Sequence, residues 1–425
     1  MKILQIASGD FFSTYGGGQV YVKNIVDEMI RQSLDVSVLS FVNKDIAIAK
    51  LDYKGIWLWE IGKLATNANI EELLLTISPD VIHAHSQKAL FTSLGDSLGI
   101  PVVITAHHGG ILCPAGALMN AEDCICQATL SHKNCLKCCL ANIRTGRNWY
   151  PVMKLLPKSS YLQLGKILQK LPSIPFITPI GGIAVSIERK INEWQTIRDK
   201  ATAIIAPSNA IAEAMCRNGL SRDKVTVIPH GIPKTTQIFA QTPKTDKIRF
   251  FYVGRICRVK GVHVLLEAFS SITNSSKAEL HIIGGAGNKS EQRYMQSLQQ
   301  RYQLPNIVWH GKVPADKVFE TIKDYDVMVH PAIYLEVFGL NIAEALAMNK
   351  PVLATRCGGA EMQIKEEVNG WLVEPNDVQA LRTKMYEIVV QGVTMDVTKL
   401  HEKVINIKEH VEDLLQIYEK ETIID

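Results

Sequence analysis

Residues 2–41 are KILQIASGDFFSTYGGGQVYVKNIVDEMIRQSLDVSVLSF, and this stretch decides the fold. Its apolar runs at 2–7 and 36–41 are short and rich in β-branched residues, which is typical of buried strands. Between them, residues 21–31 predict an amphipathic helix whose apolar side carries Val22, Ile25, Val26, Met29 and Ile30. A strand, a helix and a second strand together predict one βαβ unit of a parallel sheet.

The same alternation continues along the chain. Further strands are expected at 81–85, 102–105, 203–206 and 225–228, and a second series at 248–253, 280–283, 307–309, 327–329 and 352–355. Between the two series, residues 233–247 have the Thr, Lys, Gln and Pro content of a linker. The length of 425 residues also favours two domains. We therefore expect two doubly wound α/β halves, with a ligand at the carboxyl ends of the strands where the halves face each other.

Composition excludes several classes of protein. The chain is 47% hydrophobic and 21% charged, as expected of an ordinary globular protein. The apolar run at 3–7 is too short for a signal peptide, and no stretch of the sequence is apolar for long enough to predict a membrane-spanning helix. We therefore expect a cytoplasmic protein, in which the nine cysteines are thiols or metal ligands rather than disulfides.

One segment of the first half is strongly basic. No acidic residue lies between Asp123 and Glu188, whereas the segment contains Lys133, Lys137, Arg144, Arg147, Lys154, Lys158, Lys166 and Lys170. Aromatic residues alternate with these cations at Trp149, Tyr150, Tyr161 and Phe176. This mixture favours peripheral contact with an anionic membrane, and a solvated insertion is the alternative. Nucleic acid would also attract such charge, but we do not expect it as a partner.

A glycine run follows the first predicted strand. Gly16, Gly17 and Gly18 open the helix that begins near Gln19. Backbone amides and the dipole at a helix N-terminus favour a negatively charged ligand, although a flexible turn has the same composition. The glycine spacing is not that of a dinucleotide fingerprint, so hydride chemistry is disfavoured.

The second half holds a larger set of candidate ligand-binding groups. Arg255 and Lys260 follow the strand at 248–253, where two cations suit a diphosphate. The run EVFGLNIAE begins at Glu336, and its glycine stands at a predicted helix start whose amides could hold phosphate oxygens. Glu344 lies about one turn into that helix and could accept both hydroxyls of a ribose. Taken singly, each residue also fits an ordinary helix cap or surface ion pair.

These runs resemble a known family. GRICRVKG (254–261), EVFGLNIAEALA (336–347), PVLATRCGG (351–359) and NGWLVEPND (369–377) resemble the donor-binding half of the family 4 retaining glycosyltransferases of the GT-B fold. GGGQVYV, DVIHAHS, VVITAHH, APSNAI and VIPHGI are similar to the other half. The resemblance implies two Rossmann-like domains facing a central cleft. The first would be an acceptor-binding domain over 1–235, with the basic, cysteine-rich insertion at about 110–190. The second would bind the donor over 245–395, and a helix at about 404–425 would pack back on the first.

The resemblance also implies roles for single residues. Arg255 and Lys260 would clamp the donor diphosphate, and Glu336 and His107 would contact the transferred sugar. Residues 310–313 would meet the base. The full set of implied donor or nucleotide contacts is Gly17, Gly18, Lys312, Val313, Phe338, Gly339, Leu340 and Glu344. The sequence departs from the family at His108 and His230, where many relatives carry Asp and Asn.

The implied activity is a retaining, metal-independent hexosyl transfer. The donor would be a nucleotide diphosphate sugar with uridine or guanosine as its nucleoside, and no cofactor would be required. The acceptor would be a glycan or a lipid-linked molecule, in polysaccharide or glycolipid synthesis at the cytosolic face of the membrane. The alternative is a nucleotide-sugar epimerase or another GT-B enzyme without a glycan acceptor.

The cysteines of the insertion allow more than one interpretation. Six of the nine lie shortly after His107, at Cys113, Cys124, Cys126, Cys135, Cys138 and Cys139. Cys135 and Cys138 have the spacing of a zinc site, Cys124 and Cys126 are one residue closer than usual, and His132 offers a further ligand. Structural zinc on Cys124, Cys126, Cys135 and Cys138, unpaired thiols and disulfides all remain open, because spacing alone does not fix connectivity.

Overall fold

A computed structural model describes residues 1–7, 9–12, 16–141, 146–155, 157–170, 178–233, 246–272, 277–314, 317–396, 400 and 404–422. Residues 234–245 of the expected linker, and Arg144 and Phe176 of the basic segment, lie outside this range. The chain forms two compact units, each made of segments distant in sequence. The first contains residues 1–11, 29–228 and 414–425, and the second contains residues 12–28 and 229–413.

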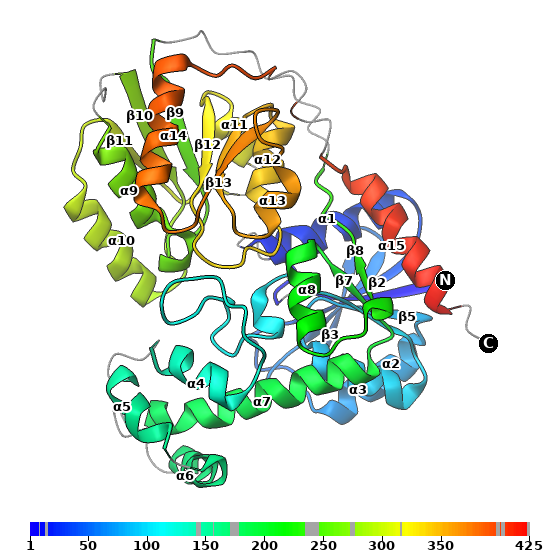
Figure 1. The fold of residues 1–425 in the computed structure, drawn as a ribbon. Coiled ribbons are helices and arrows are strands. Elements are labelled where there is room, and N and C mark those ends of the chain that lie inside the picture. Colours follow the sequence, from blue (N-terminus) through cyan, green and yellow to red (C-terminus); the bar gives the residue numbers. More distant parts are fainter. Residues whose placement is uncertain are drawn as a thin grey trace. The chain divides into compact units, whose positions relative to one another are not determined.

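The first unit is built on an eight-stranded sheet (Figure 1). Its strand order is β3-β4-β2-β1-β5-β6-β7-β8, and every pair is parallel except β3 with β4. The strands are β1 (Lys2–Ile6), β2 (Asp35–Phe41), β3 (Ile48–Tyr53), β4 (Ile56–Ile61), β5 (Val81–Ala84), β6 (Val102–Thr105), β7 (Ala203–Ala206) and β8 (Val225–Val227). The regular helices outside the insertion include α2 (Asn67–Ile77), α3 (Lys88–Leu98) and α8 (Asn209–Arg217). All six strands predicted for this half are confirmed.

The hairpin of β3 and β4 was not predicted. Its turn uses Lys54 and Gly55, both with positive φ, at 53° and 88°, as the tight hairpin turns that match strand twist require. β3 lies at the sheet edge and is half-buried to exposed along its length. Lys50 covers the ring of Trp57 with its ammonium 3.5 Å from the ring centroid. An edge strand that keeps such polar residues lacks the continuous apolar pattern by which the buried strands were recognised.

The insertion after β6 is helical. It consists of η1 (Gly109–Ile111), α4 (His132–Ala141), α5 (Gly146–Met153), α6 (Lys158–Lys170) and the long α7 (Thr178–Lys200). Helices α4, α5 and α7 share a small apolar core formed by Leu136, Cys139, Leu140, Met153, Ile183, Ala184 and Ile187. The basic segment therefore has a core of its own rather than being only a solvated loop.

The second unit is built on a six-stranded, wholly parallel sheet in the order β11-β10-β9-β12-β13-β14. Its strands are β9 (Ile248–Val253), β10 (Ala278–Ile283), β11 (Ile307–Gly311), β12 (Val327–His330), β13 (Val352–Thr355) and β14 (Gly370–Val373). Its helices are α9 (Val262–Ser270), α10 (Lys289–Arg301), α11 (Val318–Ile322), α12 (Leu340–Ala347), α13 (Gly359–Gln363) and α14 (Val378–Gln391). The five predicted strands are confirmed, and β14 is an additional one.

Two helices contribute to both units. α1 (Gly17–Arg31) begins in the glycine run, and its residues through Glu28 belong to the second unit. α15 (Ile407–Thr422) belongs to the second unit through Asp413 and to the first from Leu414 onward. Within the described residues, no helix combines the length and the apolar character needed to cross a bilayer. The prediction of two parallel α/β halves is confirmed.

Candidate functional site

The loop that follows β9 carries the two predicted cations. The hydroxyl of Tyr252 donates to the carbonyl of Arg255 at 2.7 Å, which fixes the backbone where the strand ends. The Arg255 side chain is 56% exposed, and its Nε lies 3.7 Å from a carboxylate oxygen of Glu291. The short turn η3 (Arg258–Lys260) then leads into α9 through Gly261, whose φ is 70°. A Cβ there would lie 1.7 Å from the carbonyl oxygen of Pro331, so this turn requires glycine.

Lys260 and Glu336 form a buried ion pair. The Lys260 ammonium donates to a carboxylate oxygen of Glu336, and the two side chains are only 19% and 11% exposed. The same ammonium lies 5.1 Å from the ring centroid of Tyr334. Burial disfavours both charges, but the attraction between them prevails. The pKa of Lys260 is consequently raised well above its ordinary value, and that of Glu336 is lowered.

His330 supports this pair from the end of β12. Its Nε2 lies 3.4 Å from the same Glu336 oxygen, and its Nδ1 lies 3.3 Å from Nδ2 of Asn341. Asn341 also donates to the carbonyl of Val253 at 2.8 Å and so joins the start of α12 to the end of β9. Burial lowers the pKa of His330 despite the adjacent carboxylate, which favours a neutral ring. Neither residue was singled out in the sequence, although a histidine at a strand end, in VMVHPA, was a signal.

Helix α12 begins at a glycine. Gly339 has φ 84°, and no described side chain caps the helix start. The preceding loop is held in place by Gln363, whose amide donates to the carbonyl of Phe338 at 2.5 Å. A backbone bond of 2.8 Å from Gly359 to the carbonyl of Glu336 adds to this support. The first-turn amides of α12 are therefore fixed in position and have no side-chain acceptor of their own.

Glu344 differs sharply from Glu336. It lies one turn after Leu340 on α12 and is partly buried. Among the described residues, its carboxylate has no hydrogen-bond or ion-pair partner. Burial raises the pKa of Glu344 to about 7. An acid of this kind lacks the hydrogen-bond donor that would stabilise its charge, and the hydroxyls of a ligand could supply one.

A cavity lies at the carboxyl ends of β10 and β11. It has a volume of about 250 Å³, and its lining includes Gly284, Gly285, Trp309, Gly311 and Lys312. The Lys312 stem packs over Gly285, where a Cβ would lie 2.7 Å from Cγ of the lysine. Val313 of the predicted base-binding segment is half-buried but does not line this cavity.

The glycine run of α1 approaches the start of α12. A Cβ on Gly17 would lie 3.3 Å from a methyl of Leu340. Tyr21, one turn farther along α1, packs against His230 with ring centroids 4.1 Å apart, and His230 in turn contacts the ring of Phe338 at 5.2 Å. The unexpected His230 is therefore a packing residue between α1 and the loop before α12.

His107 in the first unit ends a chain of buried hydrogen bonds. Its Nε2 lies 2.8 Å from Nδ1 of His85, whose Nε2 lies 2.8 Å from Oε1 of Gln5. The Gln5 amide donates to the Tyr418 hydroxyl at 3.2 Å, and that hydroxyl lies 2.5 Å from Nδ1 of His83. The amide oxygen of Gln5 can only accept, so His85 donates through Nε2 and accepts through Nδ1 from His107. This chain fixes a proton on Nε2 of His107.

The structure brings together only part of the predicted site. Within the second unit, Lys260 contacts Glu336 directly, Gly17 adjoins Leu340, and Lys312 lies in the cavity at β10 and β11. Arg255 does not line that cavity, but its Cδ would lie 3.4 Å from a Cβ on Gly287, the residue after the lining Ala286. His107 belongs to the first unit. Among the described residues, no three His, Cys, Asp or Glu side chains are placed to hold a metal ion.

Two families match the chain. Glycosyltransferase Family 4 matches residues 15–121, and Glycosyl transferases group 1 matches residues 233–410. A D-inositol 3-phosphate glycosyltransferase of Arthrobacter sp. strain FB24 is 31% identical over 191 residues, which cover 42% of this chain and 45% of that protein. An uncharacterized glycosyltransferase of Methanocaldococcus jannaschii is 28% identical over 244 residues, covering 51% and 61%. The chain thus spans about half the length of the curated relatives it matches.

Solved structures with the same architecture cover nearly the whole chain. Anabaena Alr3699/HepE, solved in complex with UDP and glucose, has a TM-score of 0.65 and 17% identity over 99% of both chains. Sucrose-phosphate synthase of Thermosynechococcus elongatus has a TM-score of 0.67 and 18% identity over 99% of both. The lipopolysaccharide outer core galactosyltransferase WaaB has a TM-score of 0.63 and 16% identity over 99% and 100%. The chain therefore has the predicted GT-B fold, and its sequence relatives are glycosyltransferases.

Proposed function

We propose that this protein transfers a hexosyl group from a nucleotide diphosphate sugar to a glycan or lipid-linked acceptor. The observation that carries the proposal is the buried pair of Lys260 and Glu336, which lies in the same unit as the uncapped start of α12. The names of its sequence relatives and the UDP and glucose complex of HepE support a nucleotide sugar as donor.

The cations after β9 act on the leaving group. Negative charge grows on the diphosphate as the glycosidic bond breaks, so Arg255, Lys260 and the amides at residues 338–340 would stabilise the transition state more than the ground state. Lys260 would be charged and held in place before substrate binds, because its ammonium donates to Glu336, which also lies 3.4 Å from Nε2 of His330. Glu336 would also contact hydroxyls of the transferred sugar.

The nucleoside would be bound by Glu344 and the cavity at β10 and β11. The carboxylate of Glu344 would accept both ribose hydroxyls, which would provide the partner it lacks among the described residues. Trp309 and the Lys312 stem would form the wall against which the base lies. Val313 would contact the base through its backbone, and Gly17 and Gly18 would leave room for the diphosphate beside Leu340.

The transfer would retain the anomeric configuration and need no metal ion. Arg255 and Lys260 supply the positive charge that a metal would otherwise bring to the diphosphate. The leaving phosphate would deprotonate the acceptor hydroxyl. The hydroxyl oxygen would then attack the sugar from the face that the phosphate leaves. His107, whose Nε2 proton is donated to His85, would accept at Nδ1 from a sugar hydroxyl.

The acceptor would be presented at a membrane surface. Val152, Leu155 and Ile167 of the insertion are 52%, 80% and 58% exposed, and Lys154 and Lys166 are exposed near them. Apolar side chains flanked by lysines suit the boundary between lipid headgroups and acyl chains. Each lysine close to an anionic leaflet adds about 1 kcal/mol of attraction. Sedimentation with anionic and with neutral vesicles tests this contact.

A screen of nucleotide sugars tests the donor. A true donor at a hundredfold excess over its dissociation constant stabilises the fold by about 2.7 kcal/mol, which a thermal shift detects. Hydrolysis or transfer should then release the nucleoside diphosphate, and NMR of the product should show the anomer of the donor. Conversion of the donor to an isomeric sugar in the absence of any acceptor would instead identify an epimerase. The proposal fails if neither uridine nor guanosine diphosphate sugars bind.

A further inference from the structure

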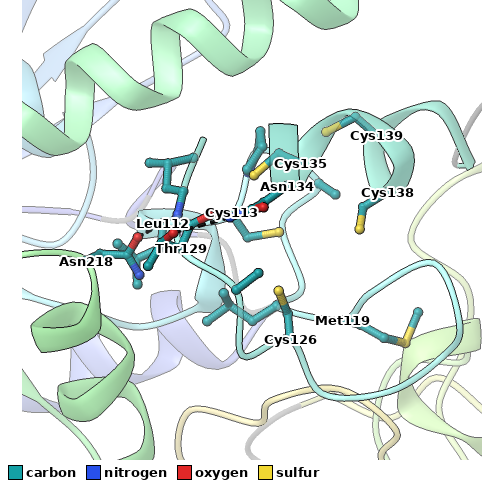
Figure 2. Close-up of a pocket in the computed structure, with 15 residues that line it drawn as sticks. Leu112, Cys113, Met119, Cys126, Thr129, Asn134, Cys135, Cys138, Cys139 and Asn218 are labelled. Carbon is teal, nitrogen blue, oxygen red and sulfur yellow. Dashed lines mark hydrogen bonds between the residues drawn. The ribbon is translucent and has the colours of Figure 1, made fainter. Parts of the chain in front are cut away.

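A small cavity in the first unit is lined by five of the nine cysteines (Figure 2). They are Cys113, Cys126, Cys135, Cys138 and Cys139, and none has a role in the proposed transfer. The cavity has a volume of about 30 Å³, where about 10 to 15 Å³ suffices for one water. The space therefore suits a single ion rather than an organic ligand.

Three separate segments bring the thiols to this cavity. Cys113 lies in the turn after η1, where its amide donates to the carbonyl of Gly109 at 2.8 Å. The amide of Cys126 donates to the carbonyl of Leu118 at 2.8 Å and closes a small loop. Cys135 and Cys138 project from neighbouring turns of α4, and in Figure 2 the sulfur of Cys126 points toward that of Cys113. Backbone hydrogen bonds thus hold the segments that carry these thiols.

The four thiols are close enough to influence one another. Burial raises the pKa of Cys135 to about 11, and the neighbouring Cys113, Cys126 and Cys138 add to the rise. Burial also raises the pKa of Cys138, to which Cys126 and Cys113 contribute in the same direction.

The remaining cysteines of the insertion fit this group less well. Cys139 is 9% exposed and belongs to the apolar core of the insertion. Cys124 is exposed and does not line the cavity. The predicted set of Cys124, Cys126, Cys135 and Cys138 therefore changes by one member, with Cys113 in place of Cys124. His132 is already engaged, since its Nε2 lies 2.6 Å from a carboxylate oxygen of Glu188.

We propose that Cys113, Cys126, Cys135 and Cys138 bind one structural zinc ion as four thiolates. Zinc favours tetrahedral sulfur ligands at about 2.3 Å. Among the described residues these side chains are not gathered into a group that could hold a metal ion, so zinc binding would require the four sulfurs to move together. Four thiols and one Zn²⁺ give a tetrathiolate complex of charge −2 and release four protons.

The charges around the cavity are of both signs. α4 contains Lys133 and Lys137, and Lys137 forms an ion pair with Glu122, whose charge also acts on Cys138. The bound ion would join the turn after η1, the loop closed at Cys126 and α4 into one rigid element. That element directly follows His107 in the chain, so the zinc would fix the segment that leads away from the predicted sugar contact.

Metal analysis of the untagged full chain, after dialysis against a chelating resin, tests the proposal. We expect about one zinc per chain, lost in Cys113→Ser and in Cys135→Ser and kept in Cys124→Ser, the matched exposed control. Nine reactive thiols without zinc, a mass that reveals disulfides, or iron with inorganic sulfide would overturn it. So would zinc that survives Cys113→Ser and Cys135→Ser.

Cobalt substitution keeps the test informative if the serine variants do not fold. The wild-type chain is stripped of zinc with a chelator and titrated with Co²⁺ at neutral pH. Four-thiolate coordination gives intense charge-transfer absorption in the near ultraviolet and the visible bands of a tetrahedral ion, saturating at one cobalt per chain. Weak octahedral bands, or no saturation, would contradict the site. Cobalt binding is measured without sugar transfer, so this test of the zinc site is independent of the proposed function.

Discussion

Where β9 and β12 end, the polar groups are charged and paired, whereas where β5 and β6 end they are joined to one another by hydrogen bonds. The second unit places Lys260 against Glu336, and both side chains stay ionised although they are buried. The first unit places Gln5, His83 and His85 at 0%, 0% and 1% exposure without any ion pair among them.

The two sets of side chains suit different tasks. A charged, preorganised group stabilises a charge that develops during reaction, which is what a leaving diphosphate requires. A chain of hydrogen bonds with fixed donors and acceptors orients a side chain instead, as we propose for His107. Parallel sheets of similar design can therefore support different chemistry at equivalent edges, because the side chains at the strand ends differ.

Removal of Lys260 should have the largest effect. Lys260→Ala deletes the diphosphate contact proposed for this residue, and we expect kcat/KM to fall about 100- to 1000-fold. It also leaves Glu336 charged and buried, which typically costs about 3 to 5 kcal/mol of stability. Transfer assays and urea unfolding measure the two effects.

The control for that loss is the exposed pair of Lys247 and Glu279. Lys247→Ala should change stability by less than about 1 kcal/mol and leave transfer unchanged. In the double variant Lys260→Met with Glu336→Gln, much of the stability should return while activity stays low. If the Lys260→Ala enzyme remained active, the pair of Lys260 and Glu336 could not have the central role proposed for it.

Replacement of Glu344 should have the next largest effect. Glu344→Gln removes the acceptor proposed for the ribose, a charged contact worth about 1.5 to 3 kcal/mol, so the dissociation constant of UDP or GDP should rise about tenfold to a hundredfold. Since the pKa of Glu344 is raised to about 7, affinity in the wild type should strengthen as pH rises through that value. Calorimetric titrations between about pH 5 and about pH 8 follow the change. Equal pH dependence in wild type and Glu344→Gln would contradict it.

The same carboxyl group should also affect stability with pH. Its ordinary pKa is 4.5 and its folded pKa about 7, so between these values the folded state binds more protons than the unfolded state. The free energy of unfolding should therefore fall as pH rises from 4.5 to about 7 and then level off. In Glu344→Gln, the free energy of unfolding measured by denaturation at several pH values should lack this decline. Glu267→Gln, which replaces an exposed glutamate on α9, should still show it.

Disruption of the hydrogen-bonded chain that runs from His107 to Tyr418 should have a smaller effect. Tyr418→Phe removes the hydroxyl that lies 2.5 Å from Nδ1 of His83. His83 and the amide of Gln5, which also contacts the sulfur of Met29, then each lose this hydrogen bond, and we expect a loss of about 1 to 3 kcal/mol in the free energy of unfolding. Chemical denaturation measures it, with Tyr386→Phe as a control, because Tyr386 is 40% exposed. Equal stability of both variants would show that the chain contributes little.

Substitution of His85 tests whether this hydrogen-bonded chain orients His107. His85→Phe removes the acceptor of the Nε2 proton, so the His107 ring is free to adopt the other tautomer. We expect kcat to fall about tenfold with little change in KM, since only orientation is lost. A raised KM with unchanged kcat would instead indicate a role in binding.

Strand order and site geometry differ in how far the sequence predicts them. The buried parallel strands were predictable because each is a short, continuous apolar run. The edge strand β3, with Lys50 and Asp52 in an exposed pattern, was not. β14 begins at Gly370, where a Cβ would lie 2.2 Å from the carbonyl of Val352, so its identity depends on packing rather than on propensity.

For the site, residue types were predictable and partnerships were not. Lys260 and Glu336 were both singled out, but their pairing depends on β9 and β12 being neighbours. His330 escaped notice because a single histidine at a strand end is common in protein cores. Cys113 was left out of the metal set because it is distant in sequence from the closely spaced cysteines, although the fold brings it to the same cavity.

The late position of Tyr418 has a consequence for biosynthesis. The residue that it contacts, His83, precedes it by 335 positions in the chain. Translation at about 5 to 20 residues per second leaves tens of seconds between the two. During that time the strands of the second sheet are synthesised, and Tyr418, which contacts His83 and Gln5, has not yet been made. A stop codon shortly before position 418 would thus remove a hydrogen-bond partner from residues near the start of the chain.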